Sequence, residues 1–160
     1  MTTPTHYVSV IGASQCSAET AALGEEVGEL LARRGCVVVC GGMEGVMAAV
    51  AKGVRQADGT CIGILPTLDR RGAAPDLTYS LCTGLGHARN LAVVASGDVV
   101  IALGGAWGTL SEIGLARSVG RQVITLRSWS LEPDEGELEG LQRASTPAEA
   151  VELALGALPH

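Results

Sequence analysis

Aromatic and basic residues are scarce in this sequence. It has no phenylalanine, two tryptophans and two tyrosines, so the hydrophobic core must be built from valine, leucine, isoleucine and alanine. Lys52 is the single lysine, the arginines are dispersed, and the net charge is −6. Proteins that bind nucleic acids draw on clustered lysine and arginine, so this composition argues against a nucleic-acid partner.

Long hydrophobic runs are also missing, although hydrophobic residues make up 47% of the chain and the mean hydropathy is +0.31. No run approaches the roughly 20 apolar residues of a membrane-spanning helix, so we expect no membrane partner. The N-terminal residues lack the charged and then apolar pattern of a signal peptide. Surplus apolar surface is better placed at a subunit interface, and we therefore expect a homodimer or a higher homo-oligomer.

Cysteines with metal-binding or redox spacing are absent as well. The five cysteines include no CxxC pair, and three of them, Cys36, Cys40 and Cys61, lie in apolar, strand-like runs. Buried, reduced thiols in a cytoplasmic protein explain this usage. The histidines at positions 6, 87 and 160 form no ligand cluster, so we expect no metal ion.

Short apolar runs alternate with longer helical patterns along the chain. Strands are predicted over 7–14 (running into a turn), 36–40, 61–65, 98–103 and 122–126. Helices are predicted over 18–35, 45–57, from 88 onward, 109–119 and 147–158, with a loop over 66–79 and a polar surface segment over 128–140. No repeat or linker interrupts this order, so residues 1–160 are expected to form a single domain.

Continuous apolar strands separated by helices indicate a parallel sheet that is covered on both faces. The expected fold class is α/β, a Rossmann-like three-layer sandwich with a mostly parallel sheet. Ligands of such folds bind outside the carboxyl ends of the strands. Those ends carry Gly12-Ala13-Ser14, Gly41-Gly42, Pro66 and Gly104-Gly105. The glycines therefore lie where a ligand is expected.

Two glycine loops connect a strand to a helix, "CGGMEGVM" over 40–47 and "LGGAWGTL" over 103–110. Such a loop presents unpaired backbone N–H groups and the positive end of the helix dipole, which suit a phosphate. The predicted phosphate-binding residues are Gly41, Gly42, Gly104, Gly105, Gly108 and Thr109. Neither loop matches GxGxxG or the Walker pattern, which disfavours a dinucleotide-dependent oxidoreductase.

Glu112 has two interpretations. Thr109-x-x-Glu112 fits a capping box, in which the threonine caps a helix and the glutamate bonds back to the cap N–H. Alternatively, Glu112 is a carboxylate at the ligand rim, available as a base or as a stabiliser of positive charge. The pattern by itself favours the cap.

The stretch "TGLGHARN" carries further candidates. Arg89 is either a solvated surface arginine or a bidentate clamp on phosphate or carboxylate. His87 and Asn90 flank it and are placed to hydrogen-bond a ribose or a base. Ser14 is predicted to contact ligand, whereas Cys16 has no partnered base and is not expected to be a catalytic thiol.

Taken together, "GG-M-EGVMAAVAKG", "TGLGHARN" and "GGAWGTLSEI" resemble the Lonely-guy (LOG) family, whose members are often mislabelled lysine decarboxylases. The sequence looks most like a small bacterial branch that is also similar to the molybdenum cofactor carrier proteins. The resemblance runs from about Val8 to Leu126 and implies a Rossmann-like fold and a dimer with sites near the subunit interface. LOG enzymes hydrolyse the N-glycosidic bond of nucleoside 5′-monophosphates to a free base and ribose 5-phosphate.

The LOG motif is PGGxGTxxE with an upstream arginine. By resemblance, its glycines fall on Gly105 and Gly108, its threonine on Thr109, its glutamate on Glu112 and its arginine on Arg89. The resemblance makes Glu112 and Arg89 the candidate catalytic residues.

Four positions depart from the family pattern. Gly104 replaces the proline, Ala106 a glycine, Ser111 an acidic residue, and Asn90 the lysine that follows the arginine. A phosphate cradle made of backbone donors tolerates such changes, whereas the placement of substrate around the catalytic glutamate is more sensitive to them.

The leading functional prediction is a LOG-type phosphoribohydrolase that acts on a small phosphate ligand, a nucleoside 5′-monophosphate, without a cofactor. The alternative is a non-catalytic binding protein, either a molybdenum cofactor carrier or a nucleotide sensor, that uses the same cradle. A lysine decarboxylase would need a lysine for a pyridoxal Schiff base, and Lys52 has no supporting site around it.

Overall fold

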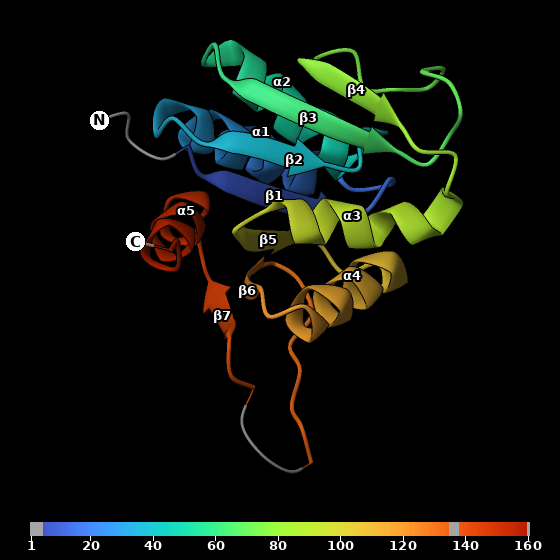
Figure 1. Cartoon of the computed structure of the whole chain (residues 1–160). Helices are drawn as coiled ribbons and strands as arrows, with labels where there is room; N and C mark the ends of the chain where they lie inside the picture. Colours follow the sequence, from blue (N-terminus) through green and yellow to red (C-terminus); the bar gives the residue numbers. More distant parts are fainter. Residues whose placement is uncertain (1–4, 135–137, 160) are drawn as a thin grey trace.

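Runs rich in valine and isoleucine form a seven-stranded sheet in which every pair of neighbours is parallel. The computed structural model describes residues 5–134 and 138–159 (Figure 1). The strands are β1 (Tyr7–Gly12), β2 (Val37–Cys40), β3 (Thr60–Leu65), β4 (Tyr79–Cys82), β5 (Val99–Leu103), β6 (Gln122–Leu126) and β7 (Leu141–Ala144). Their order across the sheet is β4-β3-β2-β1-β5-β6-β7.

Helices cover the sheet on both sides. They are α1 (Ala18–Arg33), α2 (Val46–Gln56), α3 (Arg89–Ser96), α4 (Trp107–Ser118) and α5 (Pro147–Gly156), with a short 3₁₀ helix, η1 (Gly86–Ala88), before α3. The first, second and fifth helices pack on one face, and α3 and α4 pack side by side on the other. This arrangement confirms the predicted Rossmann-like sandwich. No described helix is long and apolar enough to cross a membrane.

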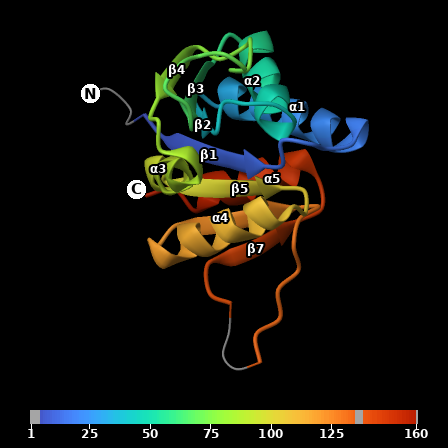
Figure 2. The ribbon, with the colours of Figure 1, turned by 90° about the vertical axis from the view of Figure 1, so that its right-hand side faces the viewer.

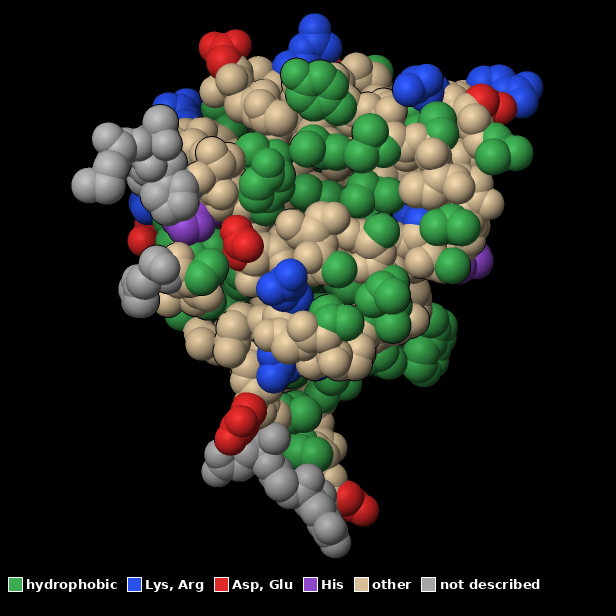
Figure 3. Space-filling model, viewed as in Figure 1, with side chains coloured by type: hydrophobic (Ala, Val, Ile, Leu, Met, Phe, Trp, Pro, Cys, Tyr) green, Lys and Arg blue, Asp and Glu red, His purple; other side chains and the backbone are tan. Residues whose placement is uncertain are grey.

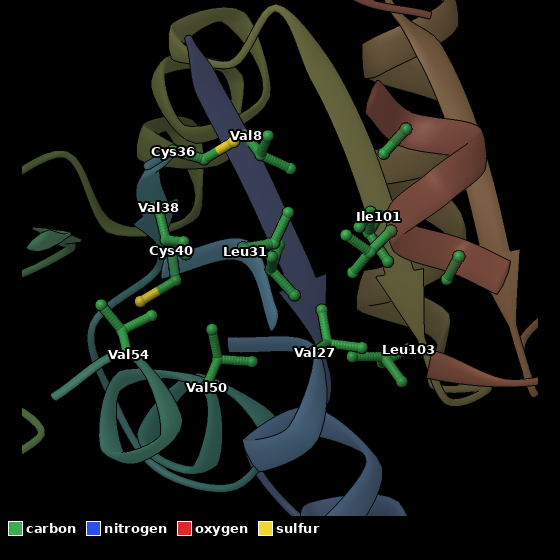
Figure 4. Packing of buried hydrophobic residues seen from close by; sticks show 14 of the residues in the cluster. Val8, Val27, Leu31, Cys36, Val38, Cys40, Val50, Val54, Ile101 and Leu103 are labelled. Atoms are coloured by element: carbon green, nitrogen blue, oxygen red, sulfur yellow. The ribbon is translucent and has the colours of Figure 1, made fainter. Parts of the chain in front are cut away.

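The core is aliphatic, as the absence of phenylalanine requires. All five residues of β5, which pairs with the central strand β1, are buried. Val27 and Leu31 of α1 pack near Ile101 and Leu103 of β5 and near Val8 of β1 (Figure 4). The described cysteines are all free thiols, and the three predicted to be buried are buried.

Most predicted boundaries agree with the structure to within two residues. The first helix begins after Ser17, whose hydroxyl accepts from the N–H of Thr20, and it ends before Gly35, which has a φ of +74°. A positive φ is inexpensive for glycine, so this residue stops the helix as expected. The surface segment predicted over 128–140 is described apart from residues 135–137, which lie outside the described part of the chain.

The strands β4 and β7 were not predicted from the sequence. They are four-residue edge strands of mixed polarity, "YSLC" and "LQRA", without an apolar run of their own. Pairing with a buried neighbour fixes them, because Tyr79 lies opposite Ile62 of β3 and Leu141 opposite Val123 of β6. These contacts are non-local, and periodicity along the chain does not report them.

Candidate functional site

A cavity of about 690 Å³ opens at the carboxyl ends of the central strands. Figure 2 shows β1 and β5 side by side and pointing to the same edge, where the loops that follow them begin. The lining comes from five loops and helix starts: Gly12, Ala13, Ser14, Gln15, Met43, Glu44, Met47, Pro66, Gly86, His87, Arg89, Asn90, Ala106, Gly108, Thr109 and Glu112. This is where ligands of open parallel sheets bind.

Helix α4 begins earlier than the sequence indicates, and the predicted capping box is wrong. Ala106 is the N-cap residue, so Thr109 lies within the first turn and Glu112 lies one turn further along. Tertiary contacts set this start, because Trp129 Nε1 donates to the Ala106 carbonyl at 3.0 Å and Ser128 Oγ to the Gly104 carbonyl at 2.6 Å.

The early start aims two polar side chains of α4 into the cavity. Thr109 is 1% exposed, and its hydroxyl has no hydrogen-bond partner among the described residues. Glu112 is 7% exposed and likewise has no described hydrogen bond or ion pair. Buried polar groups normally find partners, so this pair is poised for a ligand or for ordered water.

Arg89 is not the solvated surface arginine considered from the sequence. It is the first residue of α3, is 8% exposed, and packs its guanidinium against Gly41. Its Nη2 donates to the Gly41 carbonyl at 3.2 Å, its Nη1 donates to Asn90 Oδ1, and its Nε has no described partner. The guanidinium is therefore held in one orientation at the cavity wall.

Burial shifts the pKa values of both Glu112 and Arg89. It raises the pKa of Glu112 from 4.5 to about 7, and the positive charge of Arg89 acts in the opposite direction. Burial also lowers the pKa of Arg89, which the charge of Glu112 opposes. Near neutral pH the Glu112 carboxyl therefore exchanges a proton readily, a property that catalytic acids and bases need.

The structure brings together six of the predicted site residues at the cavity: Ser14, Arg89, Asn90, Gly108, Thr109 and Glu112. Gly41, Gly42, Gly104 and Gly105 are not among its described lining residues. Gly41 and Gly42 are buried behind the lining, where their carbonyls accept from Arg89 Nη2 and from the N–H of Ala74. Gly104 has a φ of +78° and turns the chain from β5 into α4.

Two methionines and one glutamate of the cavity were not predicted from the sequence. Met43 and Met47 line it, and Glu44 contributes an exposed carboxylate. Their position directly after Gly41-Gly42 could have indicated this, because residues that follow the carboxyl end of a strand lie at the edge of the sheet where ligands bind in such folds. Within residues 5–134 and 138–159 no group of three or more His, Cys, Asp or Glu side chains is placed to hold a metal ion.

A pair of alanine substitutions tests the packing behind the site. At Gly41 an added Cβ would lie 2.6 Å from Met47 Sδ and 2.7 Å from Arg89 Nη2, so Gly41→Ala must displace both side chains. We expect a loss of about 1–3 kcal/mol in the free energy of unfolding, measured by denaturant titration. At Gly105 an added Cβ meets no described atom within 4 Å, so Gly105→Ala is the matched control, with a change within about 0.5 kcal/mol. Equal losses in both variants would contradict this packing.

The fold and the cavity define a Rossmann-like α/β protein with a candidate ligand cavity, lined in part by Arg89 and Glu112, over the ends of its parallel strands. Residues 5–152 match the model of the SLOG cluster4 family, and the chain belongs to that family. An uncharacterized protein of Archaeoglobus fulgidus is 39% identical over 145 residues, which are 90% of this chain and 91% of that protein.

Two further similarities are to proteins whose names state a substrate or a bound cofactor. A rice protein (Oryza sativa subsp. japonica) described as a probable cytokinin riboside 5′-monophosphate phosphoribohydrolase, LOGL9, is 34% identical over 87 residues, 53% of this chain and 38% of that protein. The solved structure of the molybdenum cofactor binding protein of Rippkaea orientalis superposes with a TM-score of 0.86 and 31% identity, covering 97% of this chain and 98% of the other. These findings confirm the predicted relationship to LOG proteins and molybdenum cofactor carriers.

Proposed function

We propose that this protein is a LOG-type phosphoribohydrolase, which hydrolyses a nucleoside 5′-monophosphate to a free base and ribose 5-phosphate. One observation carries the proposal: Glu112, with a pKa of about 7, and the constrained guanidinium of Arg89 are buried at the same cavity. The similarity to the rice protein over 53% of the chain supports it.

The 5′-phosphate would bind at the start of α4. The first turn of an α-helix leaves backbone N–H groups without partners inside the helix, and the helix dipole favours an anion there. Gly108 has no Cβ, and a Cβ added there meets no described atom within 4 Å, so phosphate oxygens have room beside the backbone. The unpartnered hydroxyl of Thr109 supplies one more donor.

Hydrolysis then requires the bond between ribose C1′ and the base nitrogen to break. The bond electrons leave with the base, and an oxocarbenium-like ribose develops, as in other glycoside hydrolysis. In its ionised form, Glu112 would stabilise that charge and take a proton from the attacking water, whose oxygen bonds to C1′. The proton that Glu112 takes from water would pass to the departing base nitrogen, directly or through solvent, which returns Glu112 to its ionised form. Arg89 would hold the substrate anion in place.

The test is incubation of the pure protein with AMP and a panel of other 5′-monophosphates, with free base and ribose 5-phosphate measured by chromatography. Because the ionised form of Glu112 is the active one, kcat/KM should rise about tenfold per pH unit below 7 and level off above it. Base release with a flat profile between pH 5 and 8 would contradict the role of Glu112. Absence of base release from every nucleotide would contradict the hydrolase.

The second candidate is a non-catalytic protein that binds a phosphate ligand, as a molybdenum cofactor carrier or a nucleotide sensor. The similarity to the molybdenum cofactor binding protein over 97% of the chain favours it, as do the departures from the LOG motif at Gly104, Ala106 and Ser111. The same incubation separates the two candidates. Thermal stabilisation by the nucleotides without base release would support the binding protein.

We further propose that the protein acts as a homo-oligomer in the cytoplasm. The high mean hydropathy favours association. Free thiols at Cys16, Cys36, Cys40, Cys61 and Cys82 fit a reducing compartment.

A further inference from the structure

Glu44 brings an exposed carboxylate to the ligand cavity, and the proposed reaction does not use it. It lines the cavity, and no hydrogen bond or ion pair joins it to another described residue. By contrast, six carboxylates elsewhere in the described chain pair with an arginine or a lysine. Charged side chains are also sparse on the face of the molecule in Figure 3, which shares its view with Figure 1. An unpaired carboxylate at a cavity is therefore an uncommon feature of this protein.

The loop that carries Glu44 is fixed against the loop that follows β1. The N–H of Val46 donates to the Ala13 carbonyl at 3.0 Å. Gly45 has a φ of +66°, and a Cβ added there would lie 2.3 Å from the Ala13 carbonyl oxygen, so the two loops are in direct contact. A fixed backbone lowers the entropic cost of presenting the carboxylate to a ligand.

The strand order places Glu44 at a distance from the proposed phosphate site. Helix α4 follows β5, Glu44 follows β2, and β1 lies between these two strands. Neighbouring strands are about 4.8 Å apart, so two spacings separate the strand ends by about 10 Å. A nucleoside 5′-monophosphate spans a similar distance from its phosphorus to the far edge of its base. With its phosphate at the start of α4, such a ligand therefore brings its base to Glu44.

The cavity wall near Glu44 suits the flat faces of a base. Met43 and Met47 come from the same segment, Pro66 follows the adjacent strand β3, and all three line the cavity without a charge. Thioethers make favourable contacts with aromatic rings. These contacts do not distinguish one base from another, because every base has such faces.

Glu44 is the side chain that imposes a hydrogen-bonding requirement on the base. Outside the proposed catalytic and phosphate-binding groups, four other polar side chains line the cavity: Ser14, Gln15, His87 and Asn90. Hydroxyl, amide and neutral imidazole groups can both donate and accept, so they adapt to either partner. An ionised carboxylate only accepts, and its two oxygens match two adjacent N–H donors.

We propose that Glu44 makes the base site selective for guanine, an inference that rests on the proposed binding of a nucleoside 5′-monophosphate in this cavity. Guanine presents N1–H and its 2-amino group side by side, one for each carboxylate oxygen. Hypoxanthine offers N1–H alone. Adenine presents the N1 lone pair beside its 6-amino group, and xanthine has a carbonyl in place of the 2-amino group, so both set a lone pair against the carboxylate. The expected order of affinity is GMP, then IMP, then AMP and XMP.

Isothermal titration with these four nucleotides tests the inference. Because Glu44 is exposed, we expect GMP to bind about 10-fold more tightly than AMP, in the lower part of the range for a bidentate contact to a base. Glu44→Gln should reverse this preference, since a glutamine amide donates to N1 of adenine and accepts from its 6-amino group. Glu26→Gln, at an exposed position of α1, is the matched control and should keep the preference for GMP.

Thermal denaturation shows that each variant is folded, and the proteins also carry Glu112→Gln if the wild type releases base, so that no nucleotide is cleaved during the titration. Equal affinities of the wild type for GMP and AMP would overturn the inference. An equal loss for every nucleotide in Glu44→Gln would overturn it as well, because the carboxylate would then bind the ribose.

Base release tests the hydrolase separately. A preference for GMP that Glu44→Gln reverses, without base release from any nucleotide, would support the guanine site and contradict the hydrolase. Base release with equal kcat/KM for GMP and AMP would support the hydrolase and contradict the guanine site.

Discussion

Glu112→Gln should stabilise the protein at pH 8 and leave its stability nearly unchanged at pH 4, below the pKa of the carboxyl group in both the folded and the unfolded state. Burial raises the pKa of Glu112 from 4.5 to about 7, so the folded state binds this proton more tightly than the unfolded state. Wild-type stability therefore falls as the pH rises from about 4.5 through about 7. Glutamine has a similar shape and no proton to lose, so the variant avoids this loss.

The full effect amounts to roughly 3 kcal/mol above pH 7, or a rise of roughly 5–10 °C in Tm. Scanning calorimetry of both proteins between pH 4 and 8 measures it. Glu26→Gln is the control, because Glu26 is an exposed residue of α1 and its substitution should give no pH-dependent gain. Destabilisation by Glu112→Gln at both ends of the pH range would instead mean that the carboxylate supports the helix.

The same variant should abolish base release, with a loss of about 100-fold or more, and leave nucleotide affinity nearly intact. The phosphate contacts proposed at Gly108 and Thr109 do not involve the carboxyl group. Activity and calorimetry therefore separate catalysis from folding in one protein. Full activity of Glu112→Gln would remove Glu112 from the mechanism.

Arg89→Met should weaken the binding of AMP by roughly 100-fold, the cost of losing one partner of a desolvated charged pair. The Arg89 guanidinium is fixed by Gly41 and Asn90, so it meets an anion without further ordering. Methionine replaces the apolar stem but removes the hydrogen bonds to Gly41 and Asn90, so a thermal denaturation of the variant accompanies the binding measurement and shows whether it is folded. Loss of the positive charge should also move the pKa of Glu112 further above 7.

Isothermal titration with AMP and with inorganic phosphate gives the affinities. Arg55→Met is the matched control, since Arg55 is an exposed arginine that pairs with Asp76 at 2.5 Å and lies outside the described lining of the ligand cavity. Its affinity for AMP should equal that of the wild type. An unchanged affinity in Arg89→Met would assign the anion to another part of the cavity.

The sequence by itself determined the five central strands of the sheet and the end of the sheet at which the candidate ligand cavity lies. Apolar runs such as 36–40 and 98–103 predict strands because an inner strand of a parallel sheet is buried on both faces. Helices such as 18–35 are predicted because their own sequence contains a capping residue and a terminating glycine. Glycines at the strand ends indicated where the loops at the carboxyl edge of the sheet begin, because the backbone conformation at such turns restricts the residue type. The edge strands β4 and β7 were not predicted, because pairing with the neighbouring strands stabilises them and their own residues show no apolar pattern.

Only the tertiary structure determines the burial, the orientation and the pKa of the candidate site residues. The pattern of Thr109 and Glu112 is the same in a capping box and in a ligand site. Contacts from Ser128 and Trp129 exclude the capping box, because α4 starts two residues earlier than predicted. Arg89 likewise becomes a buried, oriented cation only because Gly41, 48 residues away, leaves room for its guanidinium. Burial, and with it the pKa of Glu112, depends on such non-local packing, which a local sequence pattern does not encode.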